Sequence, residues 1–231
     1  MKYAIVFLLS VLCFQFGNSQ IYEFGVFVGG SNLIGDVGKT NYIAPNKTAF
    51  GGVFKWNRSA RHSFRASLIY SELEALDSES DDPRRIERGF EYRNNSFIEF
   101  SAGIEFTFFD FNLHNPGAKS TPYLYTGISL ASHDNYYFNG SGVQTSENTK
   151  SIAYGIPMIV GFKTTLTDLI ILAGEIGARY TFSDELDGSV PDSEALIAQR
   201  AFGNLNNNDW YVFTGITLTY TFGRNPCYCG Y

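Results

Sequence analysis

The sequence predicts an all-β protein, an eight-stranded antiparallel transmembrane outer-membrane β-barrel with a plugged lumen. Three observations predict it: aromatic residues make up 16% of the 231 residues, charged residues only 17%, and apolar residues alternate with small or polar ones along eight segments. The charged fraction lies below the roughly 25% that is usual for soluble domains. A formal net charge of −6 also argues against a general nucleic-acid binder, because such proteins need a basic surface to displace counterions.

Residues 1–20 predict a secretory signal peptide. Lys2 precedes the apolar run 3–14, and small residues follow it. This run is shorter than the roughly 20 residues that a membrane-spanning helix needs. We therefore expect cleavage near Ser19 or Gln20 rather than a membrane anchor.

Alternation with a period of two predicts the strands, which together form an expected barrel domain over residues 21–223. In the clearest segment the even-numbered residues from Ile98 to Phe108 are apolar, whereas the odd-numbered ones from Glu99 to Thr107 are small or polar. The eight segments are 22–29, 48–57, 62–72, 97–108, 121–132, 152–165, 169–182 and 210–223.

The character of the polar face separates a membrane barrel from a soluble one. It is rich in Gly, Ser, Thr and Ala and carries few charges, which fits the narrow lumen of an eight-stranded barrel. The apolar face is then expected to contact lipid. Buried charges must pair, so we predict an ion-paired lumen. Its predicted members are Lys55, Arg65, Glu99, Glu105, Lys163, Glu175 and Arg179.

Aromatic residues near the strand ends are expected to form the two girdles that mark the membrane interfaces of such barrels. The predicted girdle residues are Tyr22, Trp56, Tyr70, Phe108, Tyr154, Phe182, Trp210 and Phe222.

Loop lengths predict the orientation, since bacterial outer-membrane barrels have short periplasmic turns and longer external loops. Long and short connections alternate, which predicts both termini in the periplasm. The polar loop 183–209 is expected to be mobile, and the turn 110–117, long for a periplasmic turn, is a candidate contact surface. The expected external segments are 31–47, 73–89, 133–151 and 183–209, and the periplasmic ones are 57–61, 109–120 and 165–168.

No pattern in the chain predicts a catalytic residue, a metal site or a cofactor. His62, His114 and His133 match no hydrolase signature. The acidic run 77–82 lacks the glycine and the terminal glutamate of a calcium loop. The arginines within 84–88 offer it simpler salt partners.

Two cysteines, Cys227 and Cys229, lie in an expected periplasmic tail, 224–231. Their C-x-C spacing departs from the usual C-x-x-C of zinc sites, and residues two apart bridge each other poorly. An intermolecular disulfide to a periplasmic partner is therefore a hypothesis for this tail.

Short motifs rich in glycine, aromatic and charged residues recur along the chain. They are Glu23-Phe-Gly25, Gly30-Ser-Asn-Leu-Ile-Gly35-Asp36-Val-Gly38, Tyr42-Ile-Ala-Pro45, Lys55-Trp56-Asn57 with Arg61, Arg85-x-x-Arg88-Gly89, Glu99-x-Ser101-x-Gly103-x-Glu105 and Thr121-Pro122-Tyr123-x-Tyr125-x-Gly127. With these motifs the chain resembles the PorG-like, DUF6089-type outer-membrane barrels of Bacteroidetes.

This resemblance implies a non-enzymatic structural subunit of the type IX secretion and gliding machinery. Such a subunit would sit in outer-membrane lipid and anchor a periplasmic ring made of a lipoprotein and its partner protein. A small outer-membrane channel and a lipid-modifying barrel enzyme are the alternatives that the sequence leaves open.

Overall fold

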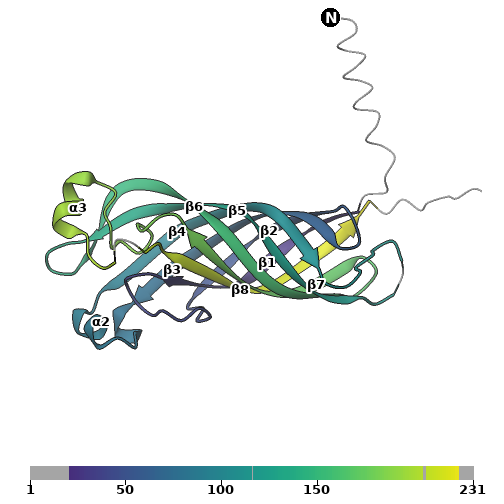
Figure 1. The fold of residues 1–231 in the computed structure, drawn as a ribbon, viewed down its shortest axis with the longest axis horizontal. Coiled ribbons are helices and arrows are strands. Elements are labelled where there is room, and N and C mark those ends of the chain that lie inside the picture. Colours follow the sequence, from purple (N-terminus) through teal and green to yellow (C-terminus); the bar gives the residue numbers. More distant parts are fainter. Residues whose placement is uncertain (1–20, 116, 205–206, 224–231) are drawn as a thin grey trace, which may run out of the picture.

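The computed structural model describes residues 21–115, 117–204 and 207–223, which form a closed antiparallel barrel (Figure 1). Each strand pairs with its neighbours in the chain, and β1 pairs with β8 to close the ring, so the predicted eight-stranded fold is confirmed. The predicted signal peptide and the tail with Cys227 and Cys229 lie outside the described residues. The strands are β1 (Ile21–Ile34), β2 (Lys47–Asn57), β3 (His62–Leu76), β4 (Glu91–Thr107), β5 (Ser120–Phe138), β6 (Gln144–Thr165), β7 (Ile170–Thr181) and β8 (Trp210–Phe222).

The outward face of the barrel is an apolar belt. Along β6, every second side chain from Ile152 to Phe162 is exposed, and each residue between them is buried. Ten residue steps of about 3.4 Å, tilted by about 45°, span about 24 Å, close to the apolar band of about 25 Å in outer-membrane barrels. A belt of this height fits a hydrocarbon surrounding. No helix in the described part of the chain is long and apolar enough to cross a membrane.

The predicted girdle residues lie in two groups. Near the short-turn end, where β1 begins and β8 ends, the Tyr22 ring stacks on Phe222 with centroids 5.6 Å apart. Toward the opposite, long-loop end, Trp210 packs edge-on against Tyr180 at 5.0 Å. Trp56 and Phe108 belong with the first group, whereas Tyr70, Tyr154 and Phe182 belong with the second.

Strands at the long-loop end run further than the sequence predicted (Figure 1). β5 and β6 continue as a hairpin, so the expected loop 133–151 shrinks to 139–143, and the expected loop 73–89 becomes 77–90. The reason is chemical: many outward side chains there are polar, so the alternation that marks lipid-facing strand disappears although the hydrogen-bond ladder continues.

In the described part of the chain, three short helices lie at the long-loop end. The 3₁₀ helix η2 spans Asp77–Glu79, and α2 spans Pro83–Arg88. Asp82 caps α2 by accepting a hydrogen bond from the Arg84 backbone N–H. The helix α3 (Glu194–Arg200) lies within the last long loop. Figure 1 shows α2 and α3 at the same end of the barrel.

Candidate functional site

The barrel lumen holds the predicted charges. All seven predicted residues point inward and are at most 5% exposed, and the same is true of an eighth, Glu23. Among the described residues, the barrel strands therefore bury four carboxylates and four cations, and the formal charge inside the wall is zero. Parity places them there, because each lies on the strand face opposite the apolar belt.

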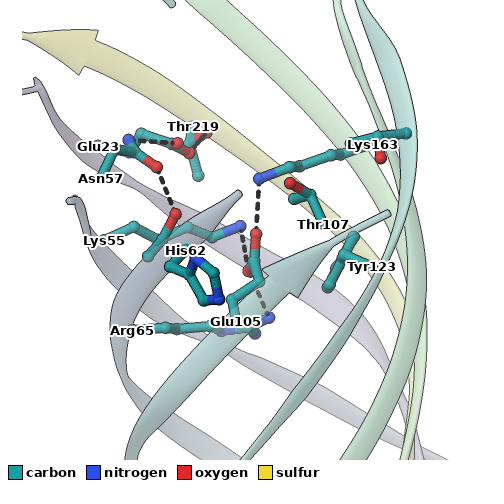
Figure 2. A network of polar contacts seen from close by, with 12 residues as sticks. Glu23, Lys55, Asn57, His62, Arg65, Glu105, Thr107, Tyr123, Lys163 and Thr219 are labelled. Carbon is teal, nitrogen blue, oxygen red and sulfur yellow. Dashed lines mark hydrogen bonds and ion pairs between the residues drawn. The ribbon is translucent and has the colours of Figure 1, made fainter. Parts of the chain in front are cut away.

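Glu105 on β4 is the centre of the first group of charges. Its two carboxylate oxygens lie 2.8 Å from Lys55 Nζ and 2.7 Å from Lys163 Nζ, and Arg65 Nη1 is 3.9 Å away. Figure 2 shows these cations converging on the one carboxylate from β2, β3 and β6. A single glutamate thus connects strands from around the ring.

Arg65 directs its guanidinium mainly to Glu175 on β7. Nη1 and Nη2 each donate to one carboxylate oxygen at 2.7 Å, a bidentate geometry that is among the strongest side-chain pairings. The Tyr123 hydroxyl also donates to Glu175. Gly161 faces Tyr123 across the β5–β6 pair, and a Cβ at Gly161 would lie 2.4 Å from the tyrosine ring. The glycine therefore makes room for the tyrosine inside the barrel.

The third group joins β4, β7 and β8. Arg179 Nε donates to Glu99 at 2.9 Å, and the Tyr211 hydroxyl donates to the same carboxylate at 2.7 Å. The guanidinium also lies 4.5 Å from the centre of the Phe213 ring, a cation–π contact. Strands on opposite sides of the lumen are tied together by these contacts.

Glu23 is the interior charge that the sequence-based list omits. Its carboxylate accepts hydrogen bonds from Asn57 Nδ2 and Thr219 Oγ1, both at 2.8 Å (Figure 2). Among the described residues it has no ion-pair partner, because Lys55, its register partner on β2, turns to Glu105. The signal was available in the alternation of the first strand, which places Glu23 on the same face as Gly25 and Phe27.

Large side chains also fill the lumen, which corrects the expectation that small residues dominate it. Phe97 packs edge-on against Tyr211 at 4.8 Å, and Phe27 lies 6.3 Å from Phe213. These rings are buried in one continuous cluster with Val53 and Ile69. Small interior residues such as Gly29 and Gly215, whose added Cβ atoms would lie 2.9 and 2.8 Å from the Phe27 ring, provide the space.

The short-turn end is closed by the turn between β4 and β5. Phe111 and Leu113 fold against Ile21 and Ile171 and are almost entirely buried. Lys163 Nζ lies 4.5 Å from the Phe111 ring, so this plug contacts the charged network directly. Only part of the predicted contact surface 110–117 is therefore free for a partner, because its apolar side chains close the barrel.

The long-loop end is covered by the last long loop, which was expected to be mobile. That expectation was wrong for the segment around Leu186, which is buried in the core cluster with Val37 and Leu33. Asp187 Oδ2 accepts hydrogen bonds from the backbone N–H groups of Asp36 and Val37. Asp187 thus connects the last long loop to the segment that follows β1.

Acidic side chains gather under this loop. Asp187 and Asp209 are buried, and burial raises the pKa of both carboxyls, with like charges nearby adding to the effect. The pKa of Asp184 rises to about 7, chiefly through desolvation and then through Asp187, Asp36 and Glu185. None of these carboxylates has an ion-pair partner in the described part of the chain.

The remaining predicted groups show no chemical constellation. His62 lies on the outer face against Phe106, His114 is exposed, and His133 is buried inside the long β5–β6 hairpin. In the acidic run, Asp77 pairs with Arg88 at 2.7 Å, as the sequence suggested. Arg85 instead donates to the backbone carbonyls of residues 35 and 38. No group of three metal-binding side chains was found among the described residues.

Comparison with known proteins identifies one family. The model of a family described as "Domain of unknown function (DUF6089)" matches residues 2–231. No curated protein matches the chain.

The solved structures with a similar fold include small β-barrels. The N-terminal barrel domain of Pseudomonas aeruginosa OprF is 11% identical with a TM-score of 0.47, and the match covers 89% of this chain and 98% of that one. The attachment invasion locus protein Ail of Yersinia pestis is 8% identical with a TM-score of 0.48, over 88% and 99% of the two chains. A major outer membrane protein of Thermus thermophilus is 12% identical with a TM-score of 0.47, over 89% and 100%.

Proposed function

Since the chain belongs to the DUF6089 family, whose description leaves its function open, we propose that it is a structural barrel of the outer membrane that anchors periplasmic components of the type IX secretion and gliding machinery. The specific role comes from the resemblance to PorG-like barrels. In this proposal the barrel carries no catalytic residue and no cofactor, and both termini lie in the periplasm.

The observation that carries the structural role is the filled lumen. Eight strands enclose about as much space as their own side chains fill. Here that space holds balanced ion pairs and a buried aromatic cluster, and an apolar plug closes the short-turn end. An interior of this kind favours an anchor over the small channel that the sequence left open.

The short-turn end supplies the surface that we assign to the periplasmic partner. Phe109 immediately precedes the turn that closes this end, and its side chain is 62% exposed. The neighbouring residue Asp110 forms an ion pair with Arg61, with 2.6 Å between Oδ1 and Nε. An exposed aromatic next to a polar rim is a common composition for protein contacts. Because Phe111 and Leu113 hold this turn against the barrel, the surface is preorganised for binding.

A pulldown tests the proposal. Tagged protein is purified from outer membrane under non-reducing conditions, and we expect the ring lipoprotein and its partner to be recovered. Phe109→Ser should reduce the recovery, whereas Ile86→Ser, an exposed apolar residue on α2 at the other end, should not. Absence of both ring components from the wild-type eluate would contradict the anchoring role.

Lipid analysis of a deletion strain addresses the enzyme alternative. We expect the lipid A profile of a deletion strain to match that of its parent. A lipid A species that disappears on deletion and returns on complementation would show a lipid-modifying activity and contradict the proposal.

A further inference from the structure

A pocket lies at the long-loop end, away from the surface that we assign to the periplasmic partner. It has a volume of about 320 Å³ and is formed where three segments meet: the end of α2, the tip of the β5–β6 hairpin and the end of α3. Its size falls at the lower end of the roughly 300–1,000 Å³ that is usual for sites of small ligands. The walls therefore suit a small molecule rather than a peptide.

The pocket is cationic in an acidic protein. Arg88 and Arg200 both line it, and none of its lining residues is acidic, although the chain as a whole carries a formal charge of −6. Two acidic side chains stand behind the wall. Asp77 is buried and binds the Nε and Nη2 side of Arg88, while Asp36 lies behind Gly203 and accepts the Asn204 backbone N–H.

Arg200 supplies the pocket with a guanidinium group that is available to a ligand. In the part of the chain that the structure describes, its guanidinium has no hydrogen bond, ion pair or aromatic partner. It lies against Gly140, where a Cβ would be 3.1 Å from Nη1. A guanidinium offers five N–H donors in a planar fork that matches the oxygens of a carboxylate or phosphate.

Arg88 is held in place beside it. Its guanidinium lies 4.7 Å from the centre of the Phe90 ring and 4.9 Å from that of Phe202, and Asp77 fixes one edge. Its Nη1 makes none of the hydrogen bonds found among the described residues. The Phe90 ring in turn stacks on Phe138 with centroids 4.4 Å apart. This donor is therefore preorganised by packing, which lowers the entropic cost of binding.

The remaining polar walls are amides. Asn139 uses its Oδ1 to accept the backbone N–H groups of Ser141 and Val143, which leaves its Nδ2 group for a ligand, and Gln199 also lines the pocket. Side-chain amides both donate and accept, as the hydroxyls of a sugar require. From two guanidinium groups, two amides and an apolar floor, we propose that this pocket binds a small acidic sugar, with its carboxylate or phosphate between Arg88 and Arg200.

Ligand-observed NMR on the detergent-solubilised mature barrel tests this assignment with glucuronate, glucose 6-phosphate, glucose and inorganic phosphate. We expect saturable binding of at least one acidic sugar, with a dissociation constant of about 1 mM or below, a range typical of a few hydrogen bonds. The acid that binds more tightly identifies the anionic group. Glucose and inorganic phosphate should each bind at least about tenfold more weakly, because each lacks half of the recognised groups.

Arg200→Ala is the decisive variant, because the arginine has no partner in the described part of the chain whose loss would disturb the fold. It should weaken binding of the acidic sugar about tenfold or more, whereas Arg84→Ala, an exposed arginine of α2 outside the pocket, should leave it unchanged. Equal binding of glucose or of inorganic phosphate, unchanged affinity in Arg200→Ala, or no saturable binding of either acid at about 10 mM would overturn the assignment.

Discussion

The lumen and the long-loop end both bury carboxylates, yet they stabilise them in different ways. In the lumen, Glu105 and Glu175 face lysine and arginine side chains at 2.7–2.8 Å. Under the last loop, Asp187 and Asp209 accept backbone N–H groups and have like charges as neighbours. The first arrangement requires ionised carboxylates, whereas the second favours protonated ones. One barrel thus contains an interior in which Glu99, Glu105 and Glu175 pair with cations and a cover in which carboxylates lie beside one another.

The largest expected effect on the free energy of unfolding comes from removing one partner of the ion pairs in the lumen. Glu105→Gln removes the carboxylate that Lys55 and Lys163 share and leaves two buried cations uncompensated. Breaking a buried pair on one side costs about 3–5 kcal/mol, so the free energy of unfolding should fall by that amount in a urea titration of the refolded barrel. Glu91→Gln on the same strand, an exposed pair at 3.5 Å, should change it by less than about 0.5 kcal/mol. Equal effects of the two substitutions would contradict the pairing.

The next effect is the pH response of the long-loop end. The folded pKa of Asp184 is raised to about 7, and those of Asp187 and Asp209 are also raised, above an unfolded value of about 3.9. Because the folded pKa is raised, protonated Asp184 contributes to the free energy of unfolding. This contribution is complete below about pH 4 and is lost as the pH rises through about 7. Arg85 donates to the backbone carbonyls of residues 35 and 38, and Arg88 pairs with Asp77, so among the described residues neither arginine forms an ion pair with these three carboxylates.

Hydrogen exchange measures this response at the amides that bind the acidic group. After correction for intrinsic exchange, protection at Val37 and Leu186 should be several-fold lower at about pH 8 than at about pH 5. Asp184→Asn should reduce the difference. Amides in the middle of β4, such as those of residues 99–105, serve as the internal reference and should not change. Protection that rises with pH would reverse the assigned sign.

A smaller effect is expected at Glu23, the interior carboxylate without a cation among the described residues. The oxygen of Gln can still accept from Asn57 Nδ2, and its Nε2 group can donate to the Thr219 hydroxyl, which can also accept. Glu23→Gln should therefore lower the free energy of unfolding by about 1 kcal/mol, as for the loss of charge from two hydrogen bonds. The urea titration used for Glu105→Gln measures it. A loss as large as that of Glu105→Gln would mean that Glu23 is a full member of the ion-pair network.

The smallest effect is expected for Asp209→Asn. The amide oxygen can accept the Leu186 and Asp187 backbone N–H groups, and the substitution removes a like charge from Asp187 and Asp184. The free energy of unfolding at about pH 8 should therefore stay within about 0.5 kcal/mol of wild type or rise. Marked destabilisation would show that the Asp209 carboxylate makes a contact that an amide cannot replace and that the two regions do not differ as described.

The sequence predicted the barrel wall well because alternation depends on a local contrast between lipid and lumen. It placed Lys55, Arg65 and Glu105 on one face without knowledge of their partners, since parity alone decides the face. It could not show that Glu105 lies between two lysines, because their strands are far apart in sequence. It also missed the outer parts of β5 and β6, where residues 133–135 and 144–151 are polar and the alternation of apolar residues is lost.

Sequence reasoning failed in a different way at the two ends of the barrel. The turn around Phe111 and the loop around Leu186 read as exposed connections, yet each folds back to close a mouth. Single apolar residues within polar loops carry no periodic signal, so only tertiary packing reveals their role. The pocket between Arg88 and Arg200 escaped notice for the same reason, because its walls come from three separate segments.

Conductance in planar lipid bilayers tests the central claim most directly, that the lumen is filled and that the barrel is a structural element. We expect the purified mature protein to insert without unitary current steps across the accessible voltage range, because ion pairs and the Phe111 plug occupy the interior. Reproducible unitary conductance from the wild-type barrel would contradict the account.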